Sequence, residues 1–400
     1  MRSIALLLVA LLSIALLWIN FAIHRTPAVG STAEVEALQA QLTYLEPRMH
    51  AGLPNDMQKL FPEGRVFAQA LYALSWCGLA ERRAADDTLR LHALREARWA
   101  YDELNSAHSQ RQFPISTPLP LGAFYAGWRN QVLAALVALD PSDTAVAVAF
   151  DRESATIAAA FAGSASPYPE SYTGQAWPAD GVVALHSLRL HERLRGADHS
   201  AVIDRWVQLV RTRRDGRNMI PHKWSLVRDE FHQSGRGSSL ALMNVFLPDI
   251  DSTLAAEQFD RWKSLFVMER FGVPAAREHP IGDASPGDID SGPLILGFGP
   301  ASTIVGAPAC KRNGDVFHAT ECTRTVHGFG LATCFNGQRY IFGALPIADL
   351  FIAWGRSIPS AALESPPPGY GRFHALSLLL AALLWSPWLL RWWRRRRTSG

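Results

Sequence analysis

Residues 65–80 read RVFAQALYALSWCGLA, and residues 123–139 read AFYAGWRNQVLAALVAL. Both runs are small and apolar on nearly every side, which is typical of helices that are buried all round. Similar runs begin near Asp180, Ser238, Ser291 and Leu345. The starting points differ by roughly 52 to 58 residues, an interval that suits two helices and their connections, so the repeat predicts six helical hairpins.

More amphipathic segments lie between these runs, at residues 87–108, 142–161, 199–213 and 252–271. Asp87, Asp143 and Asp251 are suited to cap three of them. Buried and amphipathic helices in alternation predict a mainly α fold, an (α/α)6 toroid of helical hairpins. Residues 302–342 read as mixed strand and loop, which predicts degenerate final repeats. An irregular helical domain is the alternative.

Two apolar segments bracket this region. Residues 4–23 contain no charge and match the thickness of a bilayer core, although a cleaved signal peptide is the alternative. Residues 373–393 are apolar and rich in tryptophan, and Arg394–Arg397 follow them. Such a cluster favours a membrane helix with a cytoplasmic end over a buried C-terminal helix.

The two segments predict the domain plan and the location. Residues 1–29 form an N-terminal anchor, residues 30–363 the extracytoplasmic toroid, residues 364–372 a Pro/Gly linker, and residues 373–400 a second membrane helix with an arginine-rich tail. The expected location is the inner (cytoplasmic) membrane, with the main domain in the periplasm and both termini in the cytoplasm. The lipid bilayer is therefore an expected partner.

Charge and cysteine content narrow the function classes. The formal net charge of +3 includes five arginines between residues 391 and 397. The rest of the chain carries about −2, so nucleic acid is not an expected partner. Cys310, Cys322 and Cys334 could supply one disulfide by three pairings, whereas Cys77 stands apart. Their spacing is unlike that of a zinc site.

Residues 217–237 lack a helical pattern and contain β-branched and aromatic residues. This composition predicts a β-hairpin or an extended segment that interrupts the helices, here called the excursion. The strings at 219–222 and 236–239, with those at 270–273 and 288–293, resemble features of bacterial six-hairpin proteins. These proteins include glycosidase-like toroids and the linalool dehydratase/isomerase group. The resemblance covers residues 165–300 and implies a toroid with a cavity at one mouth.

Candidate site residues lie mainly where the buried helices begin, since free N–H groups and helix dipoles suit polar ligands there. Asp180 and Asp290 are the expected acid and base. The expected ligand-binding residues are Glu170, Tyr172, Gln175, Trp177, His222, Arg236, Asp288 and Trp128.

Each of these residues also has a structural alternative. Asp180, Asp290 or Ser291 would cap a helix, Arg236 would pair with Asp229 or Glu230, and Trp128 would be core. Asp288 and Asp290 would point the same way in an extended stretch. Asp-x-Asp loops also bind calcium, but no twelve-residue EF-hand pattern follows. No metal or cofactor is therefore expected.

The chain lacks the G-x-G-x-x-G, Walker, H-E-x-x-H and G-x-S-x-G motifs in their required contexts. The first hypothesis is a membrane-anchored enzyme that hydrolyses envelope carbohydrate, with a glycan or small-molecule ligand. The second is a linalool dehydratase/isomerase-like lyase acting on a small apolar alcohol. Tyr172, Asp180 and His222 would be its proton relay, and it would also need a cysteine, for which the buried helices offer no clear match beyond Cys77. The third is a non-catalytic envelope scaffold or binding protein.

Overall fold

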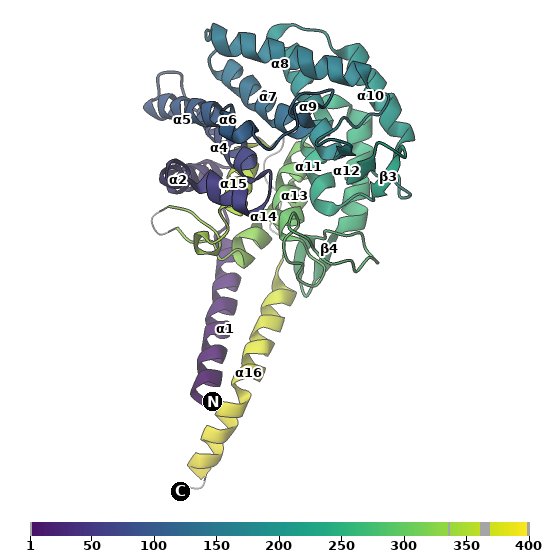
Figure 1. The fold of residues 1–400 in the computed structure, drawn as a ribbon. Helices are drawn as coiled ribbons and strands as arrows, with labels where there is room; N and C mark the ends of the chain where they lie inside the picture. Colours follow the sequence, from purple (N-terminus) through teal and green to yellow (C-terminus); the bar gives the residue numbers. More distant parts are fainter. Residues whose placement is uncertain (1, 335–336, 361–368, 398–400) are drawn as a thin grey trace.

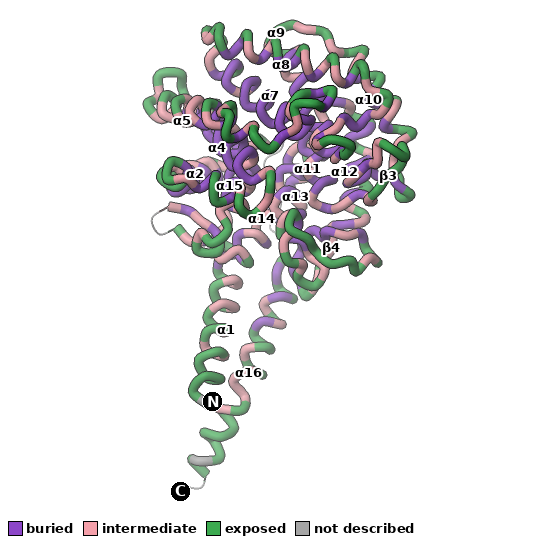
Figure 2. Tube along the Cα trace, viewed as in Figure 1, coloured by how far each residue is buried: buried purple, intermediate pink, exposed green. Residues whose placement is uncertain are grey.

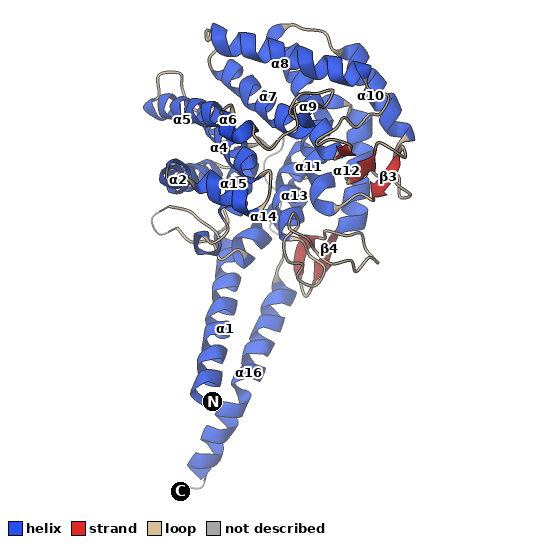
Figure 3. Ribbon diagram, viewed as in Figure 1, coloured by secondary structure: helices blue, strands red, loops and turns tan. Residues whose placement is uncertain are grey.

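The chain is mainly helical (Figures 1 and 3). The computed structural model describes residues 2–334, 337–360 and 369–397. Residues 364–368 of the predicted linker at 364–372 lie outside this part of the chain, and a helix already begins at Gly371, within the predicted linker.

The central layer consists of helices that pack in a closed order (Figure 1). Each helix in the following series contacts the next, and the last contacts the first. Within the described residues they are α4 (Gly64–Ala80), α7 (Gly122–Leu139), α9 (Pro178–Arg195), α11 (Gly237–Ile250), α13 (Pro300–Arg312) and α15 (Pro346–Ser357). The apolar runs seen in the sequence supply these helices, because a helix surrounded by neighbours has no face left for water.

A second layer surrounds the first. In the described part of the chain it comprises α2 (Thr32–His50), α5 (Thr88–Leu104), α8 (Thr144–Gly163), α10 (Ser200–Thr212), α12 (Ser252–Phe266) and α14 (Val316–Phe329). Helix α2 packs on both α15 and α4. An N-terminal helix therefore covers the place where the end of the first layer meets its beginning.

The predicted caps are present. The carboxylates of Asp87, Asp143 and Asp251 accept hydrogen bonds from the backbone N–H groups at the starts of α5, α8 and α12. Proline takes the first position of α9, α13 and α15, where its missing N–H costs nothing.

The fifth apolar run begins later than predicted. Helix α13 starts at Pro300, not near Ser291, because Gly292, Leu296 and Gly297 have positive φ angles and break the helix. The prediction of mixed strand and loop for residues 302–342 is largely wrong, since most of α13 and all of α14 lie there. The segment at 252–271 leaves its helix at Phe266.

Short elements fill the connections. The predicted excursion contains β2 (Lys223–Ser225) and β3 (Glu230–Gln233), which pair antiparallel, and β1 (Gln175–Ala176) adds to β2. A separate hairpin pairs β4 (Val267–Arg270) with β5 (Val273–Ala276). Four short helices also lie in the described connections, namely α3 (Leu53–Leu60), α6 (Ala107–Gln110) and the 3-10 turns η1 (Ile23–Arg25) and η2 (Ile341–Gly343).

Two helices leave the domain together. Helices α1 (Arg2–Ala22) and α16 (Gly371–Arg397) contact each other, and their free ends lie on the same side of the molecule (Figure 1). Most of their residues are exposed, unlike those of the domain (Figure 2). The spans Ser3–Arg25 and Gly371–Arg394 have mean hydropathies of 2.6 and 1.7, so both are long and apolar enough to cross a membrane.

Every cysteine is a free thiol, so the disulfide considered from the sequence is not formed. Cys310 and Cys322 are buried, whereas Cys334 is exposed. Burial raises the pKa of the Cys310 thiol well above its usual value.

Candidate functional site

The loop that precedes α9 is held tightly against the start of α7. The backbone N–H of Ala123 donates to the carbonyl of Glu170 at 2.8 Å. Gly122 has a φ of 76°, and a Cβ there would lie 2.1 Å from the carbonyl oxygen of Ser171. Only glycine fits this position, and the close approach fixes the loop that carries Ser171 and Tyr172.

Asp180 lies in the first turn of α9. Ser171, which is fully buried, donates its hydroxyl to Asp180 Oδ2 at 2.6 Å. The N-cap residue of α9 is Trp177, and it makes no side-chain cap. The alternative that Asp180 is the helix cap is therefore wrong, and its carboxyl group is available for another role.

Three acidic side chains from separate parts of the sequence lie within electrostatic range of one another. Burial raises the pKa of Asp180 to about 7 against the hydrogen bond from Ser171, and the charges of Glu63 and Asp290 act in the same direction as burial. Partial desolvation of its carboxyl group by neighbouring atoms, with the charges of Asp288 and Glu63, also raises the pKa of Asp290. Asp180 and Asp290, the expected acid and base, are thus near enough for the charge of Asp290 to act on Asp180.

Tyr172 joins this group. Its hydroxyl donates to Glu63 Oε1, and its ring contacts Trp177 edge-on with centroids 5.8 Å apart. Burial and the nearby carboxylates raise the pKa of Tyr172, so it stays a neutral donor. We call Glu63, Tyr172, Asp180 and Asp290 the carboxyl cluster.

Asp288 and Asp290 do not point the same way along an extended stretch. They belong to a turn in which Asp288 Oδ1 accepts from the N–H groups of Asp290 and Ser291 at 3.2 and 3.1 Å. Because α13 begins only at Pro300, neither Asp290 nor Ser291 caps a helix. Both residues are exposed, but the carboxylate of Asp288 is tied into the turn by these bonds.

Arg236 pairs with Asp288 instead of the predicted Asp229 or Glu230. Those two carboxylates pair with Arg213 and Arg228. Although burial opposes the change, the hydrogen bond from Arg236 lowers the pKa of Asp288. Asp288 is therefore an ionised partner of Arg236.

The other predicted residues lie around this region in different settings. His222 is buried with Nδ1 3.2 Å from Ser239 Oγ, and burial together with the charge of Arg236 lowers its pKa to about 3.

Gln175 is exposed, and its side-chain oxygen accepts a hydrogen bond from Lys223 Nζ at 2.6 Å. Lys223 Nζ also lies 4.5 Å from the centroid of the partly buried Trp177 ring. The side chain of Glu170 is partly buried.

Trp128 lies deeper than the other predicted residues. It is fully buried, and its ring contacts Phe67, Phe246 and Trp354 from three other central helices, with centroids 5.4 to 6.1 Å apart. These contacts are those of a core residue.

The sequence interpretation missed Glu63. It weighed only the starts of the third, fourth and fifth apolar runs, although Glu63 directly precedes the first one. It also missed Glu46, His92 and Glu96, whose donor atoms lie within 4.8 Å of one another and could hold a metal. The signal for that group is a Glu-x3-His in α2 and a His-x3-Glu in α5.

Comparison with protein-family models and with curated proteins finds no match to this chain. The geometry of the site therefore carries the functional argument.

The raised pKa of Asp180 predicts a pH-dependent stability. The folded state holds this proton up to about pH 7, whereas an unfolded aspartate releases it near pH 4. The stability contributed by protonated Asp180 is therefore complete below about pH 4 and is lost as the pH rises through about 7. We expect Asp180→Asn to unfold at a higher temperature than the wild type at pH 8. Thermal unfolding at several pH values would contradict this if the gap between the two proteins did not grow with pH.

Proposed function

We propose that this protein is a membrane-anchored extracytoplasmic enzyme that hydrolyses carbohydrate of the cell envelope by acid/base catalysis. The observation that carries the proposal is the convergence of Glu63, Asp180 and Asp290, which come from three distant parts of the sequence. Glycoside hydrolysis needs two carboxyl groups in different protonation states. Asp180 would be the general acid, because burial keeps it protonated up to about pH 7. Asp290, which is exposed, would be the base that activates water.

The (α/α)6 toroid is part of the proposal. Its support is the closed order of contacts from α4 through α15 and the second layer of helices around it. In such a fold the starts of the inner helices meet at one mouth. Tyr172 and Trp177 would provide aromatic surfaces beside the carboxyl groups, as ligand sites commonly do.

The lyase alternative has less support. His222 interacts with Ser239, Arg236 and Asp288, and none of its described contacts reaches Tyr172 or Asp180. Cys77 lies thirteen residues beyond the first residue of α4, about 20 Å along the helix axis. The described contacts of these residues therefore give the relay and its cysteine no support.

A substrate assay tests the proposal. The full-length protein, purified in detergent, is incubated with soluble fragments of envelope polysaccharides, and the release of reducing ends is measured. We expect release from at least one polysaccharide, with a rate that falls as the pH rises above about 7 because the general acid ionises. Binding without release from any of them would instead indicate a binding module or scaffold.

The proposed orientation places both termini in the cytoplasm. Its support is the Arg394–Arg397 cluster and the shared side on which α1 and α16 end (Figure 1). We expect a reporter fused after Gly400 to be cytoplasmic and one inserted at the exposed Val227 to be extracytoplasmic. When the four arginines are replaced by asparagine, a fraction of the reporters fused after Gly400 should be extracytoplasmic. An extracytoplasmic signal from the fusion after Gly400 in the unmodified chain would overturn the orientation.

A further inference from the structure

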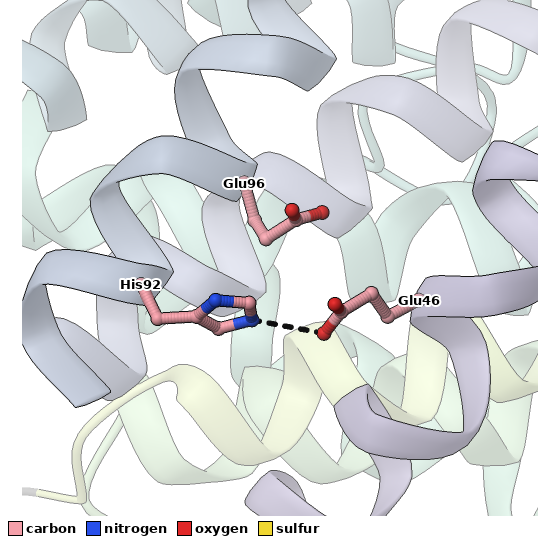
Figure 4. Close-up of side chains that lie close together, drawn as sticks. All are labelled: Glu46, His92 and Glu96. Atoms are coloured by element: carbon pink, nitrogen blue, oxygen red, sulfur yellow. Dashed lines mark hydrogen bonds and ion pairs between the residues drawn. The ribbon is translucent and has the colours of Figure 1, made fainter. Parts of the chain in front are cut away.

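Helices α2 and α5 present an interlocking set of histidine and glutamate side chains. Glu46 and His50 are one turn apart on α2, and His92 and Glu96 are one turn apart on α5, so each pair shares a helix face. The pairs meet across the two helices, with His92 Nε2 2.9 Å from Glu46 Oε2 and His50 Nε2 2.9 Å from Glu96 Oε2. Figure 4 shows Glu46 and His92 pointing toward each other below Glu96.

Three of these side chains offer a suitable donor set. One ligand atom from each of Glu46, His92 and Glu96 lies within 4.8 Å of the other two. A metal bound to imidazole nitrogen and carboxylate oxygen needs bonds of about 2.0–2.2 Å, so a small inward movement would close the site. Two carboxylates and one imidazole leave a net negative charge at the site, and this charge favours a dication.

The neighbours of these residues resemble the supporting contacts of known metal sites. Glu96 Oε2 accepts hydrogen bonds from Tyr72 at 2.7 Å and from His50, which leaves the other oxygen free for an ion. The His92 ring packs edge-on against Trp76, with centroids 5.2 Å apart. Such contacts orient metal ligands and fix their position. The side chains of Glu46 and His92 are 29% and 32% exposed, so solvent can deliver an ion.

We propose that Glu46, His92 and Glu96 bind a divalent transition-metal ion of the Zn2+ class and that Tyr72 and His50 position Glu96. Imidazole selects a transition metal over Mg2+ or Ca2+, which prefer oxygen ligands alone. Three protein ligands leave one tetrahedral position for water. The ion would join α5 to α2, the helix that covers the junction between α15 and α4, and would stabilise this arrangement independently of any catalysis.

Zn2+ titration of the full-length protein in detergent micelles tests the proposal. The protein is first stripped with a chelator, and binding is then measured by calorimetry and thermal unfolding. We expect one Zn2+ ion to bind tightly per protein molecule. The unfolding temperature should rise as well, because an ion that binds the folded state alone stabilises it. His92→Ala should weaken this binding more than 100-fold, and Tyr72→Phe by about 10- to 100-fold.

Two further variants keep the test decisive. Glu46→Gln preserves the shape of the side chain, and glutamine can still accept a hydrogen bond from His92. This variant should therefore fold, yet it should lose the tightly bound Zn2+ ion. His318→Ala is the matched control, because His318 is 30% exposed and lies 2.8 Å from Asp315 in a comparable pair. The His318→Ala variant should still bind one Zn2+ ion tightly. Equal Zn2+ binding by the wild type, His92→Ala and Glu46→Gln would overturn the proposal, as would a Zn2+-independent unfolding temperature. Neither readout depends on hydrolysis, so failure here would leave the carbohydrate assignment standing.

Discussion

Asp180→Asn is expected to lower the turnover of a polysaccharide substrate by about 10²- to 10⁴-fold while the protein stays folded. Asparagine keeps the shape of aspartate, and its Oδ1 can still accept the hydrogen bond that Ser171 now donates at 2.6 Å. What it lacks is the transferable proton that burial retains on Asp180 up to about pH 7. The measurement is the initial rate of reducing-end release at pH 6, together with the unfolding temperature.

Asp349→Asn is the matched control for this variant. Asp349 also lies in the first turn of a central helix, and burial raises its pKa to about 7 as well. Its carboxylate accepts from Gln41 of α2 and from the Tyr340 N–H, and so belongs to the contacts with the second layer. We expect this control to retain its rate. Full activity of both Asp180→Asn and Asp290→Asn on a substrate that the wild type hydrolyses would remove these residues from the mechanism.

Lys311→Met is expected to destabilise the fold by about 3–5 kcal/mol. Lys311 and Glu34 form a buried ion pair between α13 and α2, with Nζ and Oε1 2.6 Å apart and side chains only 1% and 4% exposed. Lys311 also donates to the Gly355 carbonyl of α15 at 3.0 Å. Removing the ammonium group leaves the Glu34 carboxylate buried without its counter-charge, which is far costlier than losing an exposed pair. Thermal unfolding in detergent measures the loss.

Lys263→Met provides the comparison. Lys263 pairs with Asp315 at 3.2 Å, but its side chain is 31% exposed, so its loss should cost no more than about 1 kcal/mol. Adding Glu34→Gln to Lys311→Met should recover part of the stability, because the double variant no longer buries an unpaired charge. A cost for Lys311→Met as small as that for Lys263→Met would show that water or another cation solvates Glu34.

The local sequence predicted most of the helices, because the spacing of apolar and polar residues shows which faces of a helix are buried and which are exposed to water. Five of the six apolar runs begin within two residues of the observed starts of α4, α7, α9, α11 and α15. Asp87, Asp143 and Asp251 cap the helices that they were expected to cap. The predicted start of α13 was wrong because the apolar residues between Ser291 and Phe298 have the pattern of a buried helix. Residues with positive φ angles form turns there instead.

The sequence by itself determined the repeated helices, the two apolar segments and the loops in which polar and aromatic residues gather. It could not determine which carboxylates meet. Glu63, Asp180 and Asp290 are separated by more than a hundred residues at each step. Only the packing of the central helices lets the charges of Glu63 and Asp290 raise the pKa of Asp180, and the charge of Glu63 raise that of Asp290. The same holds for Glu46 on α2 and His92 on α5, and for Lys311 and Glu34. The physical reason is that periodicity reports burial along one helix, whereas contacts between side chains depend on how separate helices pack.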